Sequence, residues 1–158
     1  SLFGEPIKLN SKLLKHPNSN LDKPTRTYIN FEYENNLYGS LNINHDSILE
    51  SDMWTAGFEI EGDMGVCSGK ISSMIGDGKN FKDNISFTSK NSDEPLVFNK
   101  ELDGRWFSDA FIGPMFSLIE AIDNNTQPET NIADAFKTLR LLNLIEKSHE
   151  TSSIISCQ

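Results

Sequence analysis

Two stretches of strict apolar–polar alternation predict a pair of antiparallel strands in the first third of the chain. The positions on one side of these strands are Thr27, Ile29, Phe31 and Tyr33 in the first run and Leu37, Gly39, Leu41 and Ile43 in the second. A two-residue loop would place the two sets on opposite faces of the hairpin. A three-residue loop, Glu34-Asn35-Asn36, keeps them together by pairing Tyr33 with Leu37. We therefore predict the three-residue loop, with Asn36 in a left-handed conformation.

The other side of this hairpin is polar. It carries Tyr28, Asn30, Glu32, Tyr38, Ser40, Asn42 and Asn44. A solvated sheet face is the simplest interpretation of so polar a set. If two copies of this face met around a two-fold axis, the Glu32 carboxylates would repel unless each met a Lys or Asn.

Apolar spacings of three and four predict two helices near the C-terminal end. The second is the clearer one, with Asn131 as N-cap and Asp134 in its first turn. Its stripe consists of Ala135, Phe136, Leu139, Leu142 and Ile145, widened by Leu141 and Leu144. The first helix has a stripe of Phe111, Met115, Leu118, Ile119 and Ile122, and Asn124-Asn125 ends it. We expect 116–122 and 135–145 to pack on the sheet face carrying Ile29, Phe31, Leu41 and Ile43, with Phe136 buried.

Further alternating segments predict the remaining strands. They are Ile7–His16 (if Ser11 is tolerated among Ile7, Leu9 and Leu13), Trp54–Glu61, Val66–Ile75, the region of Ile85 and Phe87, Leu96–Phe98, and a last short strand at Ile154-Ile155. Gly62 and Gly65 frame a turn. The predicted fold is α+β, a mostly antiparallel open β-sheet with two C-terminal helices packed on one face. Its length of 158 residues fits a single domain, 1–158.

Composition narrows the classes of function. A net charge of −9 without a basic cluster argues against a nucleic-acid surface. No apolar run approaches the length of a membrane span. Cys67 and Cys157 have neither zinc-site nor disulfide spacing, so we expect two free thiols in a reducing, cytoplasmic compartment.

No group of residues in the sequence has the types and spacing of a known active-site motif. His16, His45 and His149 have no metal-binding partner at useful spacing. Glu59 and Glu61 share one strand face, where a solvated pair is a more ordinary interpretation than a glycosidase-like one. We therefore assign no catalytic, cofactor-binding or metal-binding residue from the residues alone.

The order of the C-terminal segments adds a resemblance to a known family. Two predicted helices are joined here by a polar linker. The first helix contains Ala121-Ile122, the linker contains Pro128, and the second helix runs from Asp134-Ala135 through Lys147-Ser148. Glu59-Ile60 with Gly62 and Gly65 adds a strand–turn–strand element. Together these segments resemble the C-terminal part of the glucose–fructose oxidoreductase and inositol dehydrogenase (Gfo/Idh/MocA) family.

This resemblance implies a parent enzyme that moves a hydride between NAD or NADP and a sugar or polyol carbon. In the family a glycine-rich turn, a Glu-Lys-Pro segment and a Gly-x-His segment precede this domain, and none of them occurs in this sequence. We therefore expect a C-terminal, substrate-side and oligomerisation fragment that is inactive by itself and holds no cofactor. The resemblance also implies that Trp54 can face the sugar cleft, although an ordinary buried Trp is the commoner case.

The resemblance further implies a homodimer through the open sheet face, with Tyr28, Asn30, Glu32, Tyr38, Asn42 and Asn44 at the interface. Two other interpretations stay open. The chain can belong to a non-catalytic family member that acts as a sensor or regulator, or it can be an unrelated α+β binding domain. The coding sequence upstream separates these possibilities.

Overall fold

A computed structural model describes residues 3–46, 56–71, 83–90, 96–101 and 109–158 of the chain. Two compact units are distinguished, one formed by Ser1–Ile48 with Thr130–Gln158 and the other by Leu49–Glu129. Each contains a four-stranded sheet in which every neighbouring pair is antiparallel. The predicted α+β class, with open antiparallel sheets and two helices, is confirmed.

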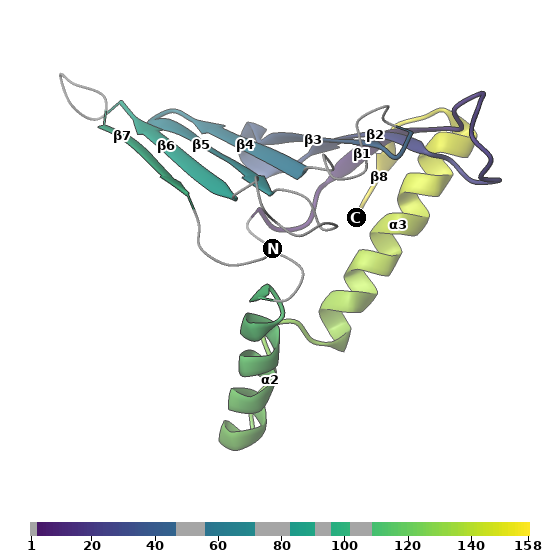
Figure 1. Ribbon diagram of the computed structural model, residues 1–158. Coiled ribbons are helices and arrows are strands. Elements are labelled where there is room, and N and C mark those ends of the chain that lie inside the picture. The colour runs from purple at the N-terminus through teal and green to yellow at the C-terminus, as the bar shows by residue number, and fades with distance from the viewer. Residues whose placement is uncertain (1–2, 47–55, 72–82, 91–95, 102–108) are drawn as a thin grey trace. The chain divides into compact units, whose positions relative to one another are not determined.

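The first unit is built on sheet A, which has the strand order β3-β2-β1-β8. Its strands are β1 (Lys8–Leu14), β2 (Arg26–Glu32), β3 (Tyr38–Asn44) and β8 (Ile155–Ser156). The helix α3 (Ile132–Thr151) lies along one face of this sheet (Figure 1). The short C-terminal strand predicted at Ile154-Ile155 is thus present, one residue later, against β1.

The turn between β2 and β3 has the predicted three-residue length. It forms the short helix η1 (Glu34–Asn36), and the N–H of Tyr33 donates to the carbonyl of Leu37. Ile29 lies opposite Leu41, as the loop length requires. Asn36 is left-handed at φ 59°, and Asn35 is left-handed as well. The register prediction is therefore confirmed.

The core of the first unit lies between α3 and sheet A. Leu9, Ile29, Ile145 and Cys157 are buried there, and the residues packed around them are Leu13, Phe31, Leu141, Leu144 and Ile155. Asn131 caps α3 as predicted, with its side-chain oxygen accepting from the N–H groups of Ala133 and Asp134. Burial of one such large apolar side chain contributes about 1.5–3 kcal/mol before the entropy cost.

The side of α3 that faces the sheet differs from the predicted stripe. Leu141, Leu144, Ile145 and Ser148 face the core, whereas Phe136 is 70% exposed and Leu139 and Leu142 are exposed too. The prediction of a buried Phe136 is wrong. Leu41 is likewise exposed, because α3 runs over β1 and β8 rather than over β3. The helix is apolar on more than one side, so periodicity alone fits two orientations.

Three hydrogen bonds, which we call the polar clamp, join Ser11 and Leu13 at the edge of β1 to α3. Because β8 pairs only with Lys8 and Leu9, the rest of that edge has no strand neighbour in the described part of the chain. There the N–H of Ser11 donates to Ser148 Oγ at 3.0 Å, and Ser11 Oγ donates to the carbonyl of Ile145 at 2.6 Å. Leu13 N–H reaches His149 Nδ1 at 3.4 Å. Side chains of the helix thus satisfy N–H groups that a longer strand would otherwise satisfy.

The second unit contains sheet B, an up-and-down meander with strand order β4-β5-β6-β7. Its strands are β4 (Ala56–Gly62), β5 (Gly65–Ile71), β6 (Asn84–Ser89) and β7 (Leu96–Glu101). The ring of Phe58 lies over Gly69, where a Cβ atom would collide with it. Only a glycine leaves room for the ring at that position.

The helix α2 (Ile112–Asn124) belongs to the second unit and ends at Asn125, as predicted, in a left-handed conformation. Of its residues Ala121 is buried, whereas Phe116 and Ile122 are exposed. The predicted packing on the face that carries Ile29 and Phe31 is confirmed for α3, whose Leu141, Leu144 and Ile145 belong to that core. For 116–122 this packing stays a prediction. The strands form two sheets where the sequence predicts one, because alternation marks strands but does not specify which of them pair.

Candidate functional site

The face of sheet A opposite α3 carries mostly polar side chains, and we call it the open face. The registers place on it Lys8, Asn10, Lys12 and Leu14 of β1, Arg26, Tyr28, Asn30 and Glu32 of β2, and Tyr38, Ser40, Asn42 and Asn44 of β3. All six residues predicted for a dimer interface therefore share one face. Tyr38 is 69% exposed and Tyr28 44% exposed, so their rings present apolar area to solvent.

The structure adds β1 to this face, which the sequence analysis did not do. Lys8 lies opposite Glu32, and their Nζ and Oε1 atoms are 2.9 Å apart. This hydrogen bond and the charge of Glu32 raise the pKa of Lys8. Each Glu32 thus meets a lysine of its own chain, which reduces the repulsion expected between two copies. The alternation of Lys8, Asn10 and Lys12 was the available signal, but only the strand pairing assigns it to this face.

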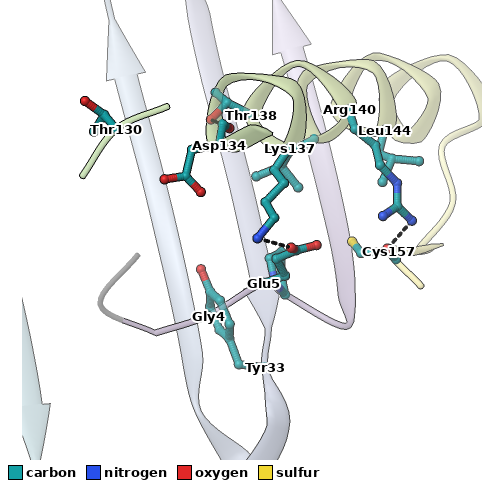
Figure 2. A pocket seen from close by; sticks show the side chains of 12 residues that line it. Gly4, Glu5, Tyr33, Thr130, Asp134, Lys137, Thr138, Arg140, Leu144 and Cys157 are labelled. Atoms are coloured by element: carbon teal, nitrogen blue, oxygen red, sulfur yellow. Dashed lines mark hydrogen bonds and ion pairs between the residues drawn. The ribbon is translucent and has the colours of Figure 1, made fainter. Parts of the chain in front are cut away.

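A cavity of about 640 Å³ lies on the other side of the unit, beside the first half of α3. Its walls are Gly4, Glu5, Pro6, Tyr33, Thr130, Asp134, Lys137, Thr138, Arg140, Leu141, Leu144 and Cys157. Figure 2 shows Lys137 reaching Glu5, with Nζ and Oε1 3.2 Å apart, and Arg140 pointing towards the C-terminal strand. There Arg140 Nη2 donates to the carbonyl of Cys157 at 2.7 Å. Sequence patterns gave no signal for this hollow, because its residues come from four separate segments.

Two titratable groups of the cavity, Cys157 and Tyr33, have pKa values above their ordinary range. Burial raises the pKa of the Cys157 thiol, which the nearby Arg140 lowers to a smaller extent. Burial also raises the pKa of the Tyr33 hydroxyl. Both groups therefore stay protonated near neutral pH, and neither is a ready base or nucleophile.

Other residues singled out by sequence do not gather into a site. Trp54 lies outside the described residues. Glu59 and Glu61 share one face of β4, as predicted, and both are exposed. Within the described ranges no group of three or more His, Cys, Asp and Glu residues could hold a metal ion. No helix described there is long and apolar enough to cross a membrane.

Comparison with known proteins identifies the fold. No family model matches the sequence, and no curated protein does so either. Among solved structures, an oxidoreductase from Agrobacterium radiobacter in complex with NAD+, L-tartaric acid and magnesium matches 99% of this chain with a TM-score of 0.77 and 12% identity. Levoglucosan dehydrogenase in complex with NADH and levoglucosan matches 98% with a TM-score of 0.73 and 15% identity.

A third similar structure is the super-repressor mutant of Gal80p from Saccharomyces cerevisiae, with a TM-score of 0.74 and 12% identity over 96% of this chain. The chain spans 44–45% of the length of these three proteins. The resemblance noted in the sequence is confirmed at the level of the fold, which is that of the C-terminal domain of Gfo/Idh/MocA oxidoreductases.

Proposed function

We propose that this chain is the C-terminal, substrate-side and oligomerisation part of an NAD(P)-dependent oxidoreductase that acts on a sugar or polyol by hydride transfer. The proposal rests on one observation: nearly the whole chain matches less than half the length of several solved proteins. One of them is levoglucosan dehydrogenase in complex with NADH and levoglucosan. The described residues contain no glycine-rich turn at a helix N-terminus, the element that holds a dinucleotide pyrophosphate. We propose that a preceding domain binds the cofactor.

The test of this proposal is the coding sequence upstream of residue 1. We expect a glycine-rich βαβ turn, a Glu-Lys-Pro segment and a Gly-x-His segment there, because they would supply the pyrophosphate site and the acid–base groups. An upstream region with an unrelated pattern would refute the assignment.

Trp54 is the residue of this chain that we propose to contact the substrate. An indole ring can stack on the apolar face of a sugar while its N–H donates a hydrogen bond. In the longer protein, Trp54→Ala should raise the KM for the sugar and leave the affinity for NADH unchanged. An unchanged KM would mean that Trp54 serves the fold only.

A second candidate function is that of a non-catalytic regulator. The similarity to a Gal80p super-repressor mutant favours it, because repression, not oxidoreduction, is the property that this name records. The upstream region also decides between the two functions. A dinucleotide-binding turn without the Lys and His would indicate the regulator.

We also propose that the open face mediates self-association. The exposed rings of Tyr28 and Tyr38 supply apolar contact area, and Asn30, Asn42 and Asn44 supply hydrogen bonds. Since a two-fold contact uses each residue twice, Tyr38→Ala and Asn42→Asp should both weaken a modest dimer. Sedimentation equilibrium tests this, and a wild-type monomer at tens of micromolar would refute it.

A further inference from the structure

We draw no further inference here: the strongest candidate, the cavity between residues 4–6 and the first half of α3, has its two cations already engaged within the chain, Lys137 by Glu5 and Arg140 by the carbonyl of Cys157, and nothing in the structure shows what fills it.

Discussion

Replacing Ser148 by alanine should destabilise the first unit more than so small a change in side-chain volume suggests. Ser148 is completely buried, at 0% exposure. Its Oγ accepts from the N–H of Ser11 at 3.0 Å and donates to the carbonyl of Ser153 at 2.7 Å. The alanine variant keeps the volume of the site nearly unchanged but removes both hydrogen bonds. Ser11 N–H then faces the helix without an acceptor.

The expected loss in the free energy of unfolding comes mainly from the N–H of Ser11, which has no acceptor in the variant. A buried N–H that loses its partner costs about 1–3 kcal/mol. The carbonyl of Ser153 contributes less, because Ser153 is exposed and water can replace the serine. The hydrophobic gain of the added methyl surface is small, so we expect a net loss of about 2 kcal/mol. Ser40→Ala on the exposed open face is the matched control, and its effect should stay within about 0.5 kcal/mol.

Urea unfolding gives the loss of stability, and amide hydrogen exchange locates it. Since the chain has two units, a global transition need not be two-state, and the exchange of the Ser11 amide reports the first unit directly. The Ser11 amide should lose protection selectively in Ser148→Ala. A loss no larger than that of Ser40→Ala, or an unchanged Ser11 amide, would refute the clamp.

Three further variants or conditions test other parts of the structure. Phe136→Ala should cost less than about 1 kcal/mol in urea unfolding, because the ring is 70% exposed, and a loss of about 3 kcal/mol would mean that it is buried. Gly69→Ala should cost about 1–3 kcal/mol, since its Cβ would displace the ring of Phe58, and wild-type stability would contradict that contact. Burial raises the pKa of Cys157 and Tyr33, so stability should be complete below their unfolded pKa values and fall as pH rises above about 9. Urea midpoints across that range check this, and Cys157→Ala should flatten the decline.

The local structure of the chain was largely predictable because local rules determine it. The β2–β3 register follows from side-chain alternation, since a slip of one residue would move Ile29 and Phe31 to the wrong face. The caps of α3 and α2 follow from Asn131 and Asn125, whose side chains suit those conformations.

Contacts between segments that are distant in the sequence could not be predicted. Ser148 is polar and interrupts the apolar stripe of α3, yet it is the most deeply buried residue of that helix. Its partner Ser11 is 137 positions away, and no periodicity connects the two. For the same reason Lys8 and Arg26 could be assigned to the open face only after β1 was known to pair with β2.

The most direct test of the central claim is a fluorescence titration with NADH of this chain and of the longer protein that contains it. We propose that this chain is the substrate-side half of an oxidoreductase and that a preceding domain holds the nicotinamide site. We therefore expect no saturable binding by residues 1–158 alone and micromolar binding by the longer protein. Saturable micromolar binding of NADH by this chain alone would contradict the account.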